Sequence, residues 1–201
     1  MSLFAKKQRQ VKEEAAKDAI YEASVKVLLE YGIDGLKMQE IANKAGIAIG
    51  TLYNYFDNRE SLLYYVDCRL RNSGLNRMEE TAKKSAPADK KLNDFIVEFF
   101  TFGDKHHLVF NLADRLGLHD RMPTDEKSDV FERAVASIRK IFDEGISQKL
   151  FREHDTQKSA KVFFFAIIGI LETKRFLSSE SSADFSQDLL DVMNIFLERK
   201  D

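Results

Sequence analysis

Residues 35–63 read GLKMQEIANKAGIAIGTLYNYFDNRESLL, and this stretch decides the fold. Its first part spaces small and apolar side chains so that they share one side of a two-turn helix over Met38–Ala45. Gly46 follows where a sharp turn needs a left-handed backbone, which costs glycine little. A second short helix is expected over Ile49–Tyr55, with Leu52 filling the gap between the two helices. The pattern predicts two short helices joined by a tight turn, which is a helix-turn-helix.

The second of these helices has several large side chains, and a helix this short cannot bury all of them. With Leu52 inside, the following residues cannot all be buried: Ile49, Thr51, Tyr53, Asn54 and Tyr55. The three hydroxyl groups suit contacts to phosphate, and the carboxamide of Asn54 can reach a base edge. Asn58 is predicted to cap the next helix. Arg59, at the start of that helix, would make a phosphate site together with the helix N-terminus.

This stretch resembles the DNA-binding domain of the TetR family of transcriptional regulators, over roughly residues 12–65. The family pattern includes an aromatic pair at the end of the recognition helix and a basic residue that opens the next helix. The matching elements are Ile41-Ala42, Ala45-Gly46-Ile47, Gly50-Thr51-Leu52-Tyr53, Tyr55-Phe56, Arg59-Glu60 and Leu62-Leu63. Beyond this stretch the chain is similar to the family only in the number and length of its helices.

The resemblance implies a DNA-binding role for each matching position. The residues expected to face the major groove are Ile49, Gly50, Thr51 and Asn54. Those expected to hold phosphates are Tyr53, Tyr55 and Arg59. Gln39 would meet the backbone or a base, and Lys44 would assist from the same helix. The chain departs from the family at Lys37, where a threonine or serine cap is usual, and at Ala48-Ile49, where polar residues are common; Ile49 would pack on a thymine methyl.

The charge distribution adds a basic arm to this picture. The formal net charge of −2 argues mildly against nucleic acid, but the distribution of charge matters more than its sum. Before Glu13 the only charged side chains are basic: Lys6, Lys7, Arg9 and Lys12. Two interpretations stay open: the arm contacts the DNA backbone or minor groove, or it is a solvated, disordered terminus.

The composition favours long helices and excludes several classes of protein. Two prolines and nine glycines in 201 residues predict an all-α chain of about nine helices. A single cysteine, Cys68, allows no intrachain disulfide, and the apolar run Val162–Leu171 is too short to span a bilayer. We therefore expect a cytoplasmic protein with no membrane partner. No catalytic constellation is evident, so we expect no enzyme activity and no cofactor.

The predicted organisation is a three-helix DNA-binding domain with its basic arm (residues 1–60) and a larger helical domain for ligand binding and dimerisation (residues 61–201). The expected helices cover residues 12–31, 38–45, 49–55, 58 onward, 92–105, 107–116, 126–148, 156–177 and 185–200. A small-molecule effector would bind among apolar side chains with a few polar anchors. The candidates, chosen from helix position, are Phe99, Phe102, Phe110, Asn111, Arg115, Phe164 and Ile168.

The histidines offer a further alternative for this domain. A structural metal is disfavoured because His106 and His107 are adjacent and face different directions on a helix. One of the first three of the four histidines is instead a candidate polar group in the effector cavity: His106, His107 or His119. His154 is the fourth.

The last helix predicts a homodimer. It carries one apolar stripe of Phe185, Leu189, Val192 and Phe196 and a second of Leu190, Met193 and Leu197. One stripe docks on its own chain, so the second needs a partner, and the last two helices of each subunit would form a four-helix bundle. Two recognition helices then require a near-palindromic double-stranded operator. The function expected is a ligand-controlled regulator of the repressor type usual in the family; the alternative is a helical small-molecule-binding or scaffold protein without DNA-binding activity.

Overall fold

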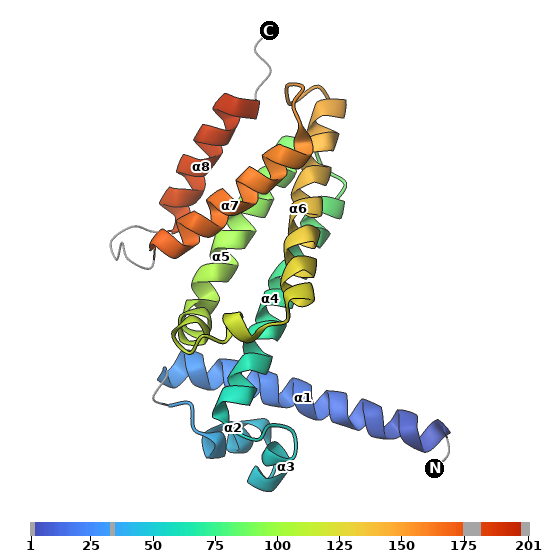
Figure 1. Cartoon of the computed structure of the whole chain (residues 1–201), viewed down its shortest axis with the longest axis vertical. Coiled ribbons are helices and arrows are strands. Elements are labelled where there is room, and N and C mark those ends of the chain that lie inside the picture. Colours follow the sequence, from blue (N-terminus) through green and yellow to red (C-terminus); the bar gives the residue numbers. More distant parts are fainter. Residues whose placement is uncertain (1–2, 33–34, 175–181, 198–201) are drawn as a thin grey trace. The chain divides into compact units, whose positions relative to one another are not determined.

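The computed structural model describes residues 3–32, 35–174 and 182–197. Within these ranges all regular structure is helical, which confirms the all-α class (Figure 1). The elements are α1 (Leu3–Tyr31), α2 (Met38–Ala45), α3 (Ile49–Tyr53), α4 (Arg59–Lys83), α5 (Ala88–Arg115), the 3-10 turn η1 (His119–Arg121), α6 (Thr124–Ser147), α7 (Thr156–Lys174) and α8 (Ser182–Leu197). The ends predicted for the last two helices, residues 175–177 and 198–200, lie outside the described residues.

The described ranges hold eight α-helices rather than nine, because two predicted helices are one. The stretches 92–105 and 107–116 belong to the single 28-residue helix α5. Neither glycine nor proline separates them, and burial continues across the expected break, from Phe100 to Val109. Gly103 is accepted inside this helix because a Cβ there would lie 2.9 Å from Cδ1 of Leu171. The glycine therefore serves close packing and does not end the helix.

Helix α1 is longer than predicted. It begins at Leu3 and runs for 29 residues, so the basic arm is helical and continues directly into the body of the DNA-binding region. Its first buried side chain is Ile20. The interpretation of the arm as a disordered terminus is therefore wrong for residues 3–12.

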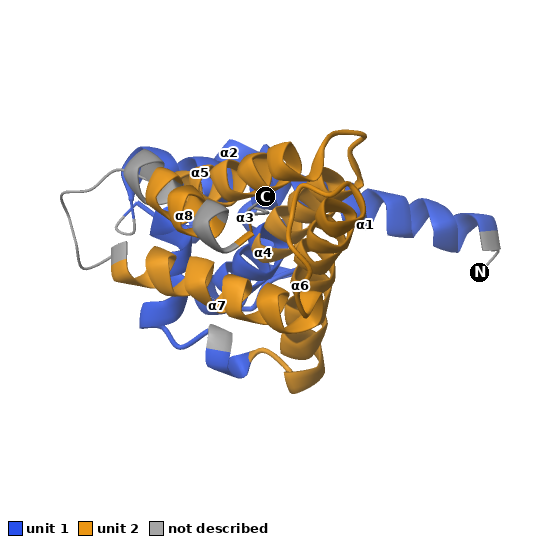
Figure 2. Cartoon of the chain, turned by 90° about the horizontal axis from the view of Figure 1, so that it is seen from above, with its two compact units in different colours: residues 1–70, 107–121 blue, residues 71–106, 122–201 orange. Residues whose placement is uncertain are grey.

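The chain forms two compact units, coloured separately in Figure 2. The first comprises residues 1–70 and 107–121, and the second comprises residues 71–106 and 122–201. Helices α4 and α5 each contribute residues to both units. No helix among the described residues is long and apolar enough to cross a membrane.

The second unit is built around an aromatic core. Phe95, Phe142 and Phe163 are almost completely buried, and the ring centroid of Phe142 lies 5.9 Å from that of Phe163. Burying each such side chain contributes about 1.5–3 kcal/mol. One charged side chain is also enclosed: the Nζ of Lys91 lies 2.5 Å from Oε2 of Glu144 and 3.3 Å from the carbonyl oxygen of Ala82. This ammonium group joins α4, α5 and α6.

Candidate nucleic-acid interface

The turn between α2 and α3 has the geometry that the sequence predicted. Helix α2 spans Met38–Ala45, and Ile41 and Ala42 are fully buried on its inner side. Gly46 has φ 69° and ψ 30°, which is the left-handed conformation. The N–H of Gly46 donates to the carbonyl of Asn43 (3.2 Å), and the N–H of Ile47 donates to that of Ala42 (3.0 Å). A tight glycine turn thus fixes the direction in which the chain enters α3.

Helix α3 is shorter than predicted, ending at Tyr53 rather than Tyr55. The backbone N–H of Phe56 still donates to the carbonyl of Leu52 (3.0 Å), so the two further residues form a turn. Leu52 is fully buried, and the ring centroid of Phe56 lies 5.0 Å from that of Tyr65 on α4. These two inward side chains fix the rotation of α3 and determine which of its residues face outward.

The outward side of α3 carries the residues predicted for DNA contact. Gly50, Tyr53 and Asn54 are exposed, with 49% of Tyr53 accessible. Ile49, Thr51 and Tyr55 are half-buried. A Cβ added at Gly50 would meet nothing within 4 Å, so the centre of this face has open space where other residues carry a side chain. The face is uncharged, and an open centre lets the helix backbone approach another surface closely.

The two α2 candidates are both exposed, and both have partners within the protein. Gln39 donates from Nε2 to Oδ1 of Asn43 at 3.0 Å. The Nζ of Lys44 lies 2.5 Å from Oε2 of Glu30 on α1. The hydrogen bond in this pair raises the pKa of Lys44 and lowers the pKa of Glu30. Lys44 would therefore have to share its charge between Glu30 and a phosphate.

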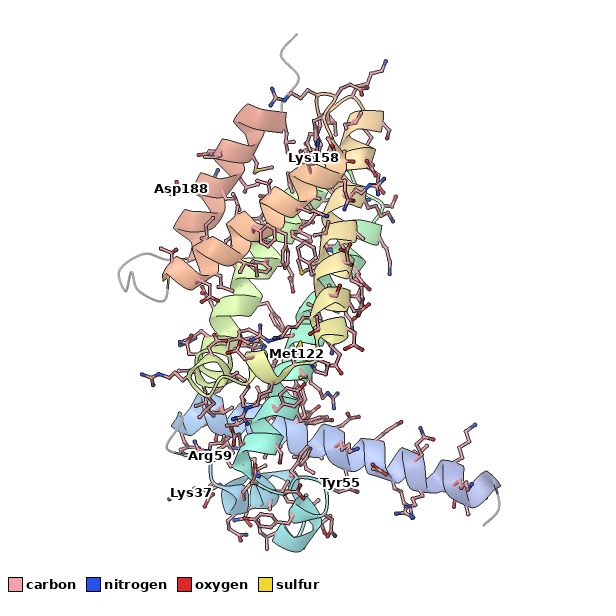
Figure 3. All side chains as sticks on the ribbon, viewed as in Figure 1. Lys37, Tyr55, Arg59, Met122, Lys158 and Asp188 are labelled. Carbon is pink, nitrogen blue, oxygen red and sulfur yellow. The ribbon has the colours of Figure 1, made fainter. Side chains whose placement is uncertain are left out.

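The start of α4 carries the last residue predicted for DNA contact, Arg59, which Figure 3 labels together with Tyr55. The predicted cap is confirmed, because the N–H of Ser61 donates to Oδ1 of Asn58 at 2.9 Å. The exposed Arg59 is the first residue of the helix. At the start of α2, by contrast, Lys37 provides no side-chain cap. The guanidinium of Arg59 thus stands at a capped helix N-terminus, a position that favours anions.

Sequence reasoning missed two features of this unit. The Nη1 of Arg121, in η1, lies 2.5 Å from Oε1 of Glu60 in the first turn of α4, a pair separated by 61 residues in the sequence. An open hollow also lies between α1 and the end of α3, lined by Ala5, Gln8, Arg9, Lys12, Glu13, Asn54 and Tyr55. The α1 residues of the hollow recur with i, i+3, i+4 spacing in the sequence. This spacing indicates a common face only if the arm is already known to be helical.

The effector candidates are divided between the two compact units. Phe99, Phe102, Phe164 and Ile168 belong to the second unit, where all four are half-buried. Phe110, Asn111 and Arg115 belong to the first, where Phe110 is buried and Arg115 is exposed. The structure does not bring the seven residues into one unit, because the boundary between the units falls within α5, between His106 and His107.

His106, one of the three histidines considered for the effector cavity, is buried in the second unit. Only 7% of it is accessible, its ring centroid lies 4.6 Å from that of Phe102, and its Nδ1 has no hydrogen-bond partner. Burial lowers the pKa of His106 to about 4, with smaller contributions from Lys105 and Arg77. Its imidazole is therefore neutral at physiological pH. The His119 side chain lies outside the described ones, and no metal-holding group of His, Cys, Asp and Glu occurs among the described residues.

Known proteins resemble this chain in its helix-turn-helix region and over most of its length. The family described as "Bacterial regulatory proteins, tetR family" matches residues 20–66. The "Fatty acid metabolism regulator protein" of Bacillus subtilis (strain 168) is 28% identical over 181 residues, which cover 89% of this chain and 90% of that protein.

Solved structures share the fold. The transcriptional regulator FadR from Bacillus subtilis, in complex with stearoyl-CoA, matches with a TM-score of 0.61 and 24% identity, over 87% of this chain and 95% of that one. A TetR transcription regulator from Haloarcula marismortui ATCC 43049 matches with a TM-score of 0.73 and 16% identity, over 91% and 98%. At these identities the structural likeness speaks for the fold, and the family match covers the helix-turn-helix itself. Residues 20–66 match the TetR family of bacterial regulatory proteins, and together with the full-length relative this match supports a DNA-binding transcriptional regulator of the TetR type.

Proposed function

We propose that this protein is a ligand-controlled repressor that binds a near-palindromic operator as a homodimer. The observation that carries the proposal is the outward side of α3, where Gly50, Tyr53 and Asn54 are exposed while Leu52 is fully buried. The major groove of B-DNA admits an α-helix, and the open centre at Gly50 allows close approach. Hydroxyl and carboxamide groups around that centre match the acceptors and donors of phosphates and base edges.

Each outward residue then has an assigned role on the duplex. The proposed groove-facing residues are Ile49, Gly50, Thr51 and Asn54, and Asn54 is the candidate for hydrogen bonds to an adenine edge. The proposed phosphate contacts are Tyr53, Tyr55 and Arg59, with Gln39 and Lys44 assisting from α2. A helical small-molecule-binding or scaffold protein without DNA-binding activity is not favoured, because it leaves this outward row of polar groups without a purpose.

The direct test is selection of duplexes by the full chain from a randomised 30-base-pair library, followed by sequencing of the retained DNA. We expect enrichment of two inverted half-sites whose centres lie about one helical turn, ~34–36 Å, or a little more apart. Failure to enrich any sequence, even at low ionic strength, would contradict the proposal. A single, unrepeated half-site would contradict the dimer but not the recognition helix.

The proposed dimer interface is the exposed apolar side of α7. Val162 is 69% accessible and Phe165 is 61% accessible, although both are large and apolar. One turn further along, a Cβ added at Gly169 would meet nothing within 4 Å. These positions recur every three or four residues, so they form one stripe along α7. A second copy could approach closely at Gly169, where no side chain intervenes.

Helix α8 contributes less to this stripe than the sequence indicated. Leu189 and Leu197, one from each predicted apolar stripe, are both buried in their own unit, whereas Val192 is 48% accessible. Leu190 and Met193 pack partly against the same core. The side chains of Phe185 and Phe196 lie outside the described ones. We therefore propose a two-fold interface of α7 and α8 in which the main outward groups come from α7.

A long-chain acyl-CoA is the proposed effector. The support is the likeness to the Bacillus subtilis fatty acid metabolism regulator and to FadR in complex with stearoyl-CoA. The second unit also offers an aromatic environment for an acyl chain: the ring centroid of Phe131 lies 5.5 Å from that of Phe164. The imidazole of His106, in the same unit, is a candidate polar anchor for the effector, because its Nδ1 has no hydrogen-bond partner.

The effector is tested by adding stearoyl-CoA to the protein bound to its selected duplex, with free CoA and stearate as controls. We expect stearoyl-CoA to weaken DNA binding about a hundredfold, which corresponds to ~2.7 kcal/mol of coupling. Equal binding with and without stearoyl-CoA would refute this effector while leaving the DNA-binding function intact. Because its proposed target is chromosomal DNA, we place the protein in the cytoplasm.

A further inference from the structure

A hollow in the DNA-binding unit adjoins the outward side of the recognition helix and shares Asn54 and Tyr55 with it. Its volume is about 660 Å³, and it is lined on one side by the first turns of α1 and on the other by Asn54 and Tyr55. The α1 residues at its wall recur at i, i+3, i+4, i+7 and i+8, so they form one helix face: Ala5, Gln8, Arg9, Lys12 and Glu13. Both walls belong to the same compact unit.

The charge of this hollow is positive. Arg9 and Lys12 stand on its α1 wall, and both are exposed. The one acidic residue of the lining, Glu13, is paired with Lys17 at 2.8 Å, a hydrogen bond that lowers the pKa of Glu13. Lys17 itself lies 6.0 Å from the ring centroid of Tyr55 on the opposite wall. With Glu13 neutralised in this way, Arg9 and Lys12 determine the electrostatic character of the hollow.

No buried side chain holds the first half of α1 against the rest of the unit. None of the described side chains before Ile20 is buried, and Figures 1 and 2 both show this half of the helix running away from α2 and α3. Residues 3–15 alone correspond to about 20 Å of helix. All four charges within its first ten residues are positive. This half of α1 is therefore a long, exposed, basic helix. One of its faces lines the hollow opposite the end of the recognition helix.

We propose that the hollow receives the sugar-phosphate backbone of the operator beside the groove that α3 enters. Arg9 and Lys12 would neutralise consecutive phosphates on one wall, and the Tyr55 hydroxyl would meet the same strand from the other. Arg9 and Lys12 lie three residues apart, about 4.5 Å along the helix, which is comparable to the ~3.4 Å that one strand advances per nucleotide. These contacts carry no base information, so they add affinity without changing the preferred sequence. The inference rests on the proposed DNA-binding function.

The test compares the wild type with the double variant Arg9→Gln/Lys12→Gln. The matched control is Lys90→Gln/Lys140→Gln, which removes two exposed charges from the other compact unit. Fluorescence anisotropy gives the affinity for the library-selected duplex and for a scrambled duplex of the same composition, from 50 to 200 mM salt. Circular dichroism and thermal melting verify that each variant keeps the wild-type helix content.

We expect the slope of log K against log salt to become less steep by about 3.6 in the double variant, because each subunit of the proposed dimer loses two phosphate contacts, and to stay unchanged in the control. Over the fourfold salt range, the wild type should lose about 150-fold more affinity than the double variant. Both duplexes should be affected equally. As a second measurement, replacing the flanking phosphates by neutral methylphosphonates should weaken binding of the wild type but not of the double variant.

Failure of this inference is distinguishable from failure of the DNA-binding function. A double variant whose salt slope equals that of the wild type and the control would overturn the phosphate assignment while recognition by α3 stands. If no duplex is selected from the library, an arbitrary 30-base-pair duplex still tests Arg9 and Lys12 at low salt. Absence of binding to any duplex at 50 mM salt would overturn both proposals.

Discussion

Asn58 and Ser61 are joined by two reciprocal hydrogen bonds, each from the backbone N–H of one residue to the side chain of the other. The N–H of Ser61 donates to Oδ1 of Asn58 at 2.9 Å, and the N–H of Asn58 donates to the Ser61 hydroxyl oxygen at 3.3 Å. This reciprocal cap satisfies two backbone donors that a helix end leaves free. It also fixes the first turn of α4, and with it the position of Arg59 beside the recognition helix.

Replacing Asn58 by alanine should lower the free energy of unfolding by about 1 kcal/mol, because the acceptor for Ser61 is lost. Asn58→Asp keeps an acceptor and should retain most of the stability. Urea unfolding followed by circular dichroism measures both variants. Equal stability of the alanine variant and the wild type would show that the cap contributes nothing.

Two glycines near the recognition helix should separate stability from DNA binding. At Gly46 the φ of 69° is unfavourable for any side chain, so Gly46→Ala should destabilise the protein by about 1–2 kcal/mol. At Gly50 a Cβ meets nothing within the protein, so Gly50→Ala should fold at least as well as the wild type. The added methyl group lies on the proposed groove-facing side, however, and should weaken binding to the selected duplex.

Unfolding and anisotropy titrations of both variants give the comparison. The account requires that Gly46→Ala shows the larger loss of stability. It also requires that Gly50→Ala shows the larger loss of affinity per folded molecule. Gly50→Ala with wild-type affinity would argue against close approach of the α3 backbone to DNA.

The helix-turn-helix was predictable because its signals are local. The spacing of Ile41 and Ala42 sets the buried side of α2, Gly46 supplies the left-handed turn, and Asn58 supplies a cap. Each of these depends on neighbours within a few residues, so tertiary context has little opportunity to override it. The exposed side of α3 followed once Leu52 was assigned to the interior.

The rest depended on contacts between distant parts of the chain. The break assumed near His106 ignored that a helix continues wherever nothing stops it and both sides are buried. The helical form of the arm, the Arg121–Glu60 ion pair and the division of the effector candidates between two units all depend on tertiary structure. The effector and dimer assignments stay predictions for the same reason: neither has a local signal as specific as the glycine turn.

The buried His106 should make stability depend on pH. Its pKa falls from the usual 6.5 to about 4 in the folded protein, because burial disfavours the charged imidazolium. Between these two values the unfolded chain binds a proton that the folded protein does not, so stability decreases as pH is lowered through this window. At pH 4.5 the loss attributable to His106 should be about 2.5 kcal/mol.

The variant His106→Gln isolates this effect, since glutamine does not titrate and carboxylates elsewhere act equally in both proteins. Urea unfolding at pH 7 and pH 4.5 should show a smaller loss of stability in the variant. Parallel losses in the two proteins would mean that His106 is protonated as readily when folded as when unfolded.

The exposed stripe of α7 should hold the dimer together. Phe165→Lys places a charge where an apolar contact is proposed, and it should convert the dimer to monomer without a large change in stability, because Phe165 is 61% accessible within the chain. Sedimentation velocity at micromolar concentration distinguishes the two states. Lys140→Gln, which changes an exposed charge on α6 outside the proposed interface, is the control. A dimer that persists in Phe165→Lys would place the interface elsewhere.

The most direct test of the central claim is the ratio of affinities for the selected and scrambled duplexes, measured by anisotropy for the wild type and for Asn54→Ala. The account predicts that the wild type prefers the selected duplex by about a thousandfold or more. Asn54→Ala should lose roughly 1–3 kcal/mol of that preference while its affinity for the scrambled duplex stays unchanged. A wild type without preference, or an Asn54→Ala variant with the full wild-type preference, would contradict the assignment of α3 as the helix that recognises the operator.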